Sequence, residues 1–205
     1  MQLTPVILSA LCAVGAVGAF SYRQRFISPR SSQLRMFSSS NGGEKCPAIP
    51  TTPQTIPNGE VAVFALGWFW HPQRDYDGLD GVVRTVVGYT GGKEPLPTYR
   101  NIKDATEAIL IEFDPSIISY AEVLKEWSTQ HSPYYPSKTQ YRSAIFYGSE
   151  EQKKLAEEMV KVLGDKDEEK NCFSSVEEMG TFYQGEEYHQ KFLEKQKSAR
   201  ALQEW

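Results

Sequence analysis

The sequence predicts a single α/β domain, a two-layer sandwich in which helices flank a small mixed sheet. Short apolar or β-branched runs alternate along the chain with segments whose apolar residues recur at helical spacing. There is one set of such elements, without an internal repeat or a second core. Hydrophobic residues make up 40% of the 205 residues, which is enough to build one core.

Four strands are expected. Residues 61–66 form a continuous apolar run up to Gly67, as is typical of a buried strand. Residues 82–89 are rich in β-branched side chains and end at a glycine-containing turn. Residues 107–113 alternate between two faces before an Asp-Pro pair, and 144–147 are expected to form a short fourth strand.

Three helices are expected between and after these strands. Ser119 and Glu122 form a capping box ahead of an apolar stripe. Ser149 precedes a second amphipathic stretch that Gly164 is expected to end. Residues 185–196 are expected to form a polar C-terminal helix.

The chain before these elements divides into three parts. Residues 1–19 are predicted to be a signal peptide, because their apolar stretch is too short to span a bilayer and ends in small residues. Residues 20–45 form a transit-peptide-like segment, rich in Arg and Ser. Together they predict targeting to the plastid of an alga with secondary plastids, and the alternative is a secreted protein. Residues 46–59 are expected to be a linker or an extended arm into a domain spanning 60–200.

Charge and cysteine content narrow the class of function. Residues 51–205 hold 17 basic and 25 acidic side chains, a net charge of −8, which argues against nucleic acid as the main partner. We expect no membrane span in the mature chain. Cys46 and Cys172 lack metal-ligand spacing, so no metal is expected, and whether they form a disulfide is open.

Four motifs in collinear order carry a resemblance to a known family. The motifs are Gly67-Trp68-Phe69-Trp70, the segments 87–92 and 97–100, the segment 113–120, and the segment 139–145. Through these motifs, between residues 60 and 195, the chain resembles the A-type peptide methionine sulfoxide reductases, the MsrA family, whose domain is ferredoxin-like. The resemblance implies action on methionine-(S)-sulfoxide in peptides, with thioredoxin or another thiol as reductant and no bound cofactor.

The family's reaction depends on a cysteine at a position where this chain has Trp68. In the family, a thiolate attacks the sulfoxide sulfur and becomes a sulfenic acid, which other thiols then reduce. An indole has no ionisable thiol and offers one N–H donor and a large apolar surface. The resemblance further implies that Phe69 and Trp70 form the apolar wall that receives the substrate methyl group.

The resemblance also assigns the groups that handle the sulfoxide oxygen. Glu107 corresponds to the buried acid that protonates it, and Tyr99 and Tyr141 correspond to the tyrosines that hydrogen-bond it. A carboxyl with a raised pKa suits this role, because it must hold a proton near neutral pH. The alternatives are that Glu107 faces solvent and that the tyrosines only hold turns.

Further differences from the family fall on the same loops. His71 stands at a position that is usually glycine, and residues 72–77 are expected to replace the usual helix. The loop before the carboxyl is shortened to 103–107, and the segments 131–133 and 136–138 lack the family's aspartates. These differences indicate a site that is no longer used in the family's way.

Two hypotheses of function follow. In the first, the protein is a pseudoenzyme that binds methionine-containing or oxidised peptides, with Trp68 filling the vacated pocket or stacking on a ligand beside Phe69 and Trp70. In the second, it is an active peptide-methionine (S)-S-oxide reductase that uses an unconventional cysteine, Cys172 or Cys46. The lone histidines at 131 and 189 are expected to be structural.

Overall fold

The computed structural model describes residues 46–165 and 171–203, which belong to one compact unit. The two leader segments lie outside these ranges, so the targeting assignment stays a prediction. The described elements are β1 (Ala48–Ile49), β2 (Glu60–Leu66), α1 (Trp70–Asp77), β3 (Val82–Thr90), β4 (Thr106–Phe113), α2 (Tyr120–Gln130), the 3₁₀ turn η1 (Thr139–Tyr141), β5 (Ser143–Tyr147), α3 (Glu150–Asp165), β6 (Ser175–Glu178), β7 (Phe182–Gln184) and α4 (Phe192–Ala201).

The sheet has seven strands in the order β1-β7-β3-β4-β2-β5-β6. Its four central strands, β3-β4-β2-β5, pair antiparallel, and α1 follows β2 while α2 follows β4. This is the β-α-β-β-α-β arrangement of a ferredoxin-like domain. β6 joins β5 in parallel, which makes the sheet mixed. The predicted fold class is confirmed.

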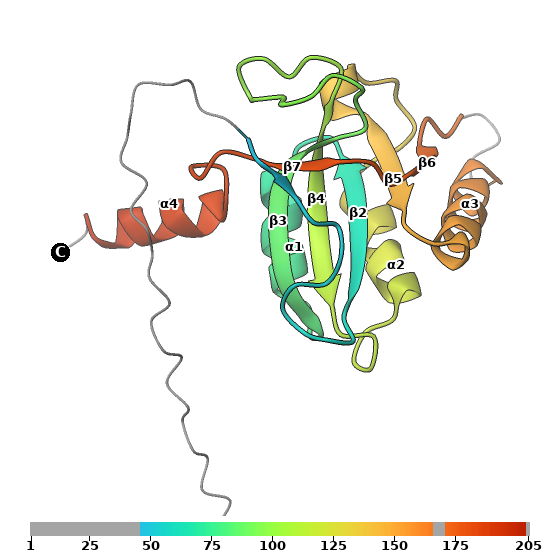
Figure 1. Cartoon of the computed structure of the whole chain (residues 1–205), viewed down its shortest axis with the longest axis horizontal. Coiled ribbons are helices and arrows are strands. Elements are labelled where there is room, and N and C mark those ends of the chain that lie inside the picture. The colour runs from blue at the N-terminus through green and yellow to red at the C-terminus, as the bar shows by residue number, and fades with distance from the viewer. Residues whose placement is uncertain (1–45, 166–170, 204–205) are drawn as a thin grey trace, which may run out of the picture. The chain divides into compact units, whose positions relative to one another are not determined.

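The larger core lies between the sheet and the helices. Phe64 of β2 is fully buried, and the rings of Tyr76, Tyr120 and Trp127 lie 6.2–6.3 Å from it. The indole Nε1 of Trp127 donates to the carbonyl oxygen of Ala65 at 3.2 Å. Figure 1 shows α1 and α2 behind the sheet, so both helices cover the same face of it.

A smaller core covers the opposite face of the sheet. Its buried members come from β2, β3, β4, β5 and β7, and they include Val63, Leu110, Phe146 and Phe182. Ile49 of β1 packs against this cluster, so the segment that precedes β2 contributes to the fold.

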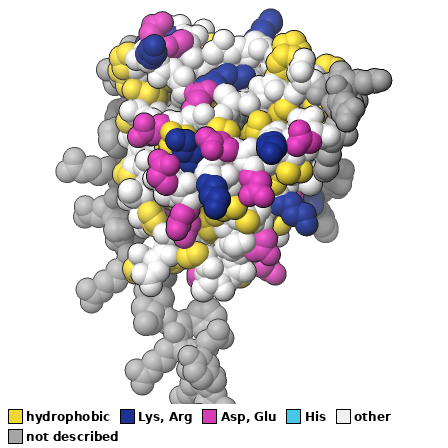
Figure 2. Space-filling view, turned by 90° about the vertical axis from the view of Figure 1, so that its right-hand side faces the viewer, with side chains coloured by type: hydrophobic (Ala, Val, Ile, Leu, Met, Phe, Trp, Pro, Cys, Tyr) yellow, Lys and Arg dark blue, Asp and Glu magenta, His cyan; other side chains and the backbone are white. Residues whose placement is uncertain are grey.

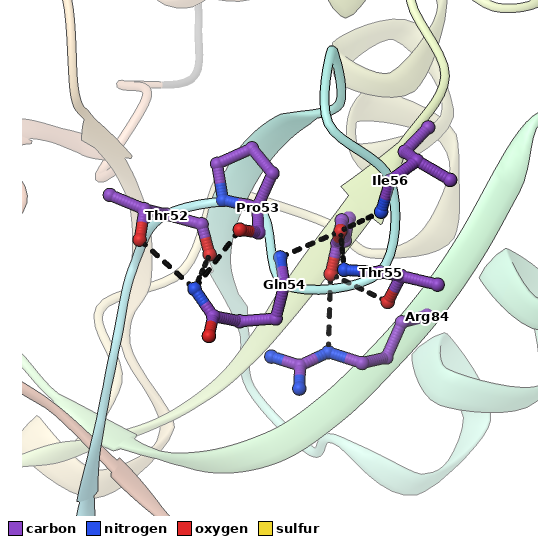
Figure 3. A network of polar contacts seen from close by, with 7 residues as sticks. Thr52, Pro53, Gln54, Thr55, Ile56 and Arg84 are labelled. Carbon is purple, nitrogen blue, oxygen red and sulfur yellow. Dashed lines mark hydrogen bonds and ion pairs between the residues drawn. The ribbon is translucent and has the colours of Figure 1, made fainter. Parts of the chain in front are cut away.

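Residues 46–59 lie against the sheet as an extended arm. β1 pairs with β7, and the loop that follows surrounds the buried carboxylate of Glu112 (Figure 3). The backbone amides of Gln54 and Ile56 donate to its Oε1 at 2.8 and 3.2 Å, and Arg84 Nε lies 3.4 Å from Oε2. Burial alone would raise the pKa of Glu112, but the hydrogen bonds from Thr55 and its neighbours outweigh burial and lower it.

Two helix predictions need correction. Residues 72–77 belong to a helix, α1. Pro72 does not prevent this helix, because it lies in the first turn, where backbone N–H groups have no partner within the helix and a missing donor costs little. The C-terminal helix begins only at Phe192, since residues 187–190 form turns and Lys191 has a left-handed φ of 52°. The strands β1, β6 and β7 were not expected from the sequence.

Acidic and basic side chains are interspersed on the face that carries α3 (Figure 2), so this face has no continuous basic surface. Of the helices in the described ranges, none is both long and apolar enough to cross a bilayer.

Candidate functional site

A cavity opens at one end of the central strands, where β2 ends and β4 and β5 begin. β2 runs antiparallel to both neighbours, which places Leu66 opposite Ser143. Gly67 then turns the chain with a φ of +82°, a conformation that side-chain-bearing residues rarely adopt. The cavity has a volume of about 490 Å³. Its wall includes four aromatic side chains, a carboxyl and an imidazole, those of Trp68, Tyr99, Tyr135, Tyr141, Glu107 and His131.

Glu107 is the second residue of β4, and its side chain is buried. Its Oε1 accepts a hydrogen bond from Gln140 Nε2 at 2.9 Å, whereas its Oε2 is buried without a hydrogen-bond partner. Loss of hydration raises the pKa of Glu107 to about 7, although Gln140 and the Phe69 amide oppose the shift. A carboxyl with this pKa holds a proton about half of the time at pH 7, so it can act as a proton donor.

Tyr99 and Tyr141 lie on the same cavity as Glu107. The pKa of Tyr141 is raised by loss of hydration, by the charge of Glu107 and by its hydrogen bond with Tyr99, which places the three groups together. The η1 turn that carries Tyr141 is tied to β4, because Thr106 Oγ1 donates to the Gln140 carbonyl at 3.0 Å. The polar half of the predicted site is therefore assembled in one place.

The loop that carries Tyr99 is held by the segment that follows β7. The Tyr99 amide donates to Glu186 Oε1 at 2.8 Å, and the other oxygen of that carboxylate accepts from Tyr89 Oη at 2.6 Å. The Tyr99 ring also lies 4.6 Å from the ring of His189. Sequence reasoning did not identify Glu186 as a supporting residue, because its partners Tyr99 and Tyr89 lie 87 and 97 residues earlier in the chain.

Trp68 forms part of the cavity wall and does not fill the cavity. Its side chain is 53% exposed, and the space beside it remains open. Its ring centroid lies 5.0 Å from that of Trp70 and 5.8 Å from that of His71. The expectation that Trp68 fills the pocket is therefore not met.

Phe69 and Trp70 do not line this cavity. Phe69 is buried, with its ring 5.1 Å from His189. Trp70 donates from Nε1 to His189 Nδ1 at 3.1 Å and stacks on Phe192 at 3.7 Å with an angle of 19° between the rings. Both residues support the wall from behind, and neither forms the apolar surface that a substrate methyl group would meet in this cavity.

A chain of hydrogen bonds stiffens another part of the wall. His131 Nδ1 lies 3.0 Å from the Trp127 carbonyl oxygen, which can only accept, so this nitrogen carries the proton. Nε2 of the neutral ring then accepts from Ser143 Oγ at 2.7 Å, and Ser174 Oγ lies 2.6 Å from the same hydroxyl. Burial lowers the pKa of His131, which favours this neutral form. Both ring nitrogens of His131 are therefore engaged in hydrogen bonds within the protein, which indicates a structural role for this residue.

Three further residues of the site were not singled out from the sequence. Gln140 adjoins Tyr141 within a recognised motif, so its position could have suggested a role. Tyr135 lies in a loop without a regular pattern, and nothing in the sequence indicates that it reaches the cavity, whereas Ser137 belongs to the segment 136–138 that the resemblance places among the altered loops of the site.

Neither described cysteine reaches the cavity wall. Cys46 is fully buried in the core on the helix side of the sheet, and Cys172 lies beside Gly164 near the end of α3. No disulfide joins these two cysteines to each other, a pairing that the sequence left open. Within the described ranges, no group of three or more His, Cys, Asp or Glu side chains is placed to hold a metal ion.

The fold and the cavity define a ferredoxin-like α/β protein with a pocket that joins aromatic rings to a protonatable carboxyl and two phenols. The family model of peptide methionine sulfoxide reductases matches residues 60–204. The chain therefore belongs to the peptide methionine sulfoxide reductase family.

Individual relatives agree with this assignment. The chain is 40% identical over 149 residues to the peptide methionine sulfoxide reductase MsrA of Sulfolobus acidocaldarius, which covers 68% of this chain and 84% of the relative. It is 38% identical over 156 residues to MsrA of Ligilactobacillus salivarius, with coverage of 71% and 91%. Among solved structures, methionine sulfoxide reductase A of Corynebacterium diphtheriae superposes with a TM-score of 0.63 at 27% identity, covering 69% of this chain and 76% of that one. The reduced form of Mxr1 from Saccharomyces cerevisiae gives a TM-score of 0.63 at 26% identity, with coverage of 69% and 88%.

Proposed function

We propose that this family member binds methionine or methionine sulfoxide side chains of peptides in the cavity and does not reduce them by the thiol mechanism. The observation that carries the proposal is that no described cysteine lines the cavity, while Trp68 does. By resemblance, Trp68 stands at the nucleophile position. An indole cannot form a sulfenic acid, so the oxygen of a bound sulfoxide has no acceptor there.

The remaining groups suit the binding of a sulfoxide. The sulfoxide oxygen is an acceptor, and protonated Glu107 and the hydroxyls of Tyr99 and Tyr141 are donors on one cavity. The exposed Trp68 ring offers an aromatic surface to the sulfur and its methyl group, a contact worth about 0.3–1.5 kcal/mol. Peptides that carry an oxidised methionine are therefore the expected ligands.

The alternative is an active reductase with an unconventional nucleophile, Cys172 or Cys46, and thioredoxin as its reductant. Partial exposure of Cys172 favours this residue over Cys46 as the reactive thiol. Either thiol would have to reach the cavity from outside its present wall, so this alternative requires movement of the chain.

One assay separates the two functions. The full chain is incubated with a peptide containing methionine-(S)-sulfoxide and with dithiothreitol, and the reduced peptide is measured. We expect no turnover above the buffer control, together with binding of the same peptide in calorimetry. Turnover would overturn the proposal, and its loss in Cys172→Ser or in Cys46→Ser would identify the nucleophile.

A further inference from the structure

Exposed aromatic rings concentrate on the cavity. In the described part of the chain, six aromatic side chains count among the exposed large hydrophobics, and four of them line this one cavity. They are Trp68, Tyr99, Tyr135 and Tyr141, with exposed fractions between 38% and 65%. A cluster of exposed aromatic surface in a concave site is typical of a binding site.

The Trp68 ring is held in place from behind. Trp70 contacts it at a centroid distance of 5.0 Å and is itself stacked on Phe192 and hydrogen-bonded to His189. His71 meets it edge-on at 83°. This support leaves much of the indole exposed beside the open cavity, so a ligand could contact it without displacing core residues.

The charge in the cavity is of one sign. No Lys or Arg is among the residues of the described chain that line it. His131 carries no charge near neutral pH, because burial lowers its pKa and its Nε2 is engaged with Ser143. Glu107 lines the same cavity and has one buried oxygen without a hydrogen-bond partner. Aromatic faces are electron-rich, so the whole cavity favours a positive charge.

We propose that this cavity binds a methylated onium group, a quaternary ammonium or a tertiary sulfonium on a side chain, with its methyl groups on the aromatic rings and its charge close to the carboxylate of Glu107. Such a cation has no N–H donors and is weakly hydrated, so a mainly aromatic wall can replace its water. A sulfonium bearing an extra methyl has the same branched shape as the sulfoxide, with CH₃ in place of oxygen. The inference rests on the proposed function in so far as the cavity is a binding site, and it names a different ligand.

Protonation of Glu107 distinguishes the two ligands. A neutral sulfoxide requires the protonated carboxyl as a donor, whereas an onium cation requires the carboxylate. The titratable groups around Glu107 are Glu186 behind Tyr99, Tyr89 on β3, the two cavity tyrosines, and the imidazoles of residues 131 and 189. Hydrogen bonds keep the pKa of Glu186 low despite its burial, burial raises the pKa values of Tyr89 and Tyr141, and burial lowers those of both histidines. Of these groups around its carboxyl, Glu107 is thus the one expected to change its charge between pH 6 and pH 8.

The test is calorimetric titration of the full chain with capped trimethyllysine, its neutral tert-butyl carbon isostere, and a peptide carrying S-methylmethionine. We expect both cations to bind and the neutral isostere to bind at least about tenfold more weakly. We expect affinity for the cations to rise roughly tenfold from pH 6 to pH 8 and to lose this dependence in Glu107→Gln. The stronger of the two cations identifies whether nitrogen or sulfur is the natural centre.

Variants locate the contact. Trp68→Leu should weaken cation binding about tenfold, Trp68→Phe should retain most of it, and Phe173→Leu, which removes an exposed aromatic outside the cavity wall, should leave it unchanged. Equal binding of cation and isostere, or absence of cation binding, would overturn the inference. Binding of the sulfoxide peptide, strongest below pH 7, is measured in parallel, so the inference and the proposed function can fail separately.

Discussion

Burial of Glu107 disfavours its ionisation. Its side chain is 1% exposed, and loss of hydration raises its pKa to about 7 even though Gln140 donates to it. In the unfolded chain the same carboxyl titrates near its ordinary value. The folded protein therefore binds this proton more tightly than the unfolded chain, and Glu107 contributes to the dependence of folding stability on pH.

Replacing Glu107 with Gln should remove that dependence. Because the folded pKa is the higher one, the stability is fully present below the unfolded pKa and is lost as pH rises towards 7 and above. Relative to Glu107→Gln, the free energy of unfolding of the wild type should fall by about 2–3 kcal/mol between pH 4.5 and pH 8. Urea unfolding at several pH values measures this difference. A constant difference between the two proteins would show that Glu107 does not titrate as described.

Between elements, buried polar contacts attach the peripheral segments to the central sheet. Glu112 on β4 accepts the amides of Gln54, Thr55 and Ile56, and Gln190 Nε2 donates to the Val87 carbonyl of β3 at 2.8 Å. These contacts join residues that lie 56 to 103 positions apart in the chain. The arm thus depends on one side chain of a central strand, Glu112, whereas the C-terminal segment is attached through its own Gln190 side chain to the backbone of β3.

Loss of the Glu112 carboxylate should release the arm. Glu112→Ala leaves several backbone amides without an acceptor, and a buried donor without a partner costs about 1–3 kcal/mol. We expect a loss of about 2–4 kcal/mol in the free energy of unfolding. Hydrogen exchange should also become faster at Gln54, Thr55 and Ile56.

The matched control is Glu60→Ala, which removes an exposed carboxylate from the neighbouring strand and should change stability by less than about 0.5 kcal/mol. Unchanged exchange of the arm amides in Glu112→Ala would contradict the role given to this residue.

At the scale of the whole molecule, the elements that the sequence predicts are those with strong local patterns. The four central strands and α2 and α3 have continuous apolar runs, alternation or capping residues. β1, β6 and β7 have two to four residues each and pair with strands distant in the chain, so no local pattern marks them. α1 was missed because residues 72–77 were expected to replace the family's usual helix, although the first turn of a helix tolerates the proline at 72.

The features of the site fall into the same two groups, those that a local motif predicts and those that depend on segments distant in the chain. Glu107, Tyr99 and Tyr141 could be assigned through motifs, and they do share one cavity. The orientation of Trp68 could not, because it depends on rings that Phe192 and His189 bring from the far end of the chain. A local sequence motif specifies which residue stands at a position, whereas the direction of its side chain depends on packing between distant segments.

The retained fold and the retained acid suggest that one substitution can test the proposed function. In Trp68→Cys, the introduced thiolate would attack the sulfur of methionine-(S)-sulfoxide, the sulfoxide oxygen would pass to the thiol sulfur with a proton from Glu107, and dithiothreitol would reduce the sulfenic acid. We expect slow but measurable turnover of the peptide, and little loss of stability because Trp68 is half exposed. Adding Glu107→Gln should lower the turnover at least about tenfold, since general acid catalysis is worth about 10²–10⁴.

Phe173→Cys serves as the control, because it introduces a thiol at an exposed position outside the cavity wall and should give no turnover. If Trp68→Cys binds the sulfoxide peptide but stays inactive, the proton donor and the sulfur position are not aligned for reaction. In that case the differences in the segments 103–107, 131–133 and 136–138, in addition to the indole, would account for the proposed absence of reductase chemistry.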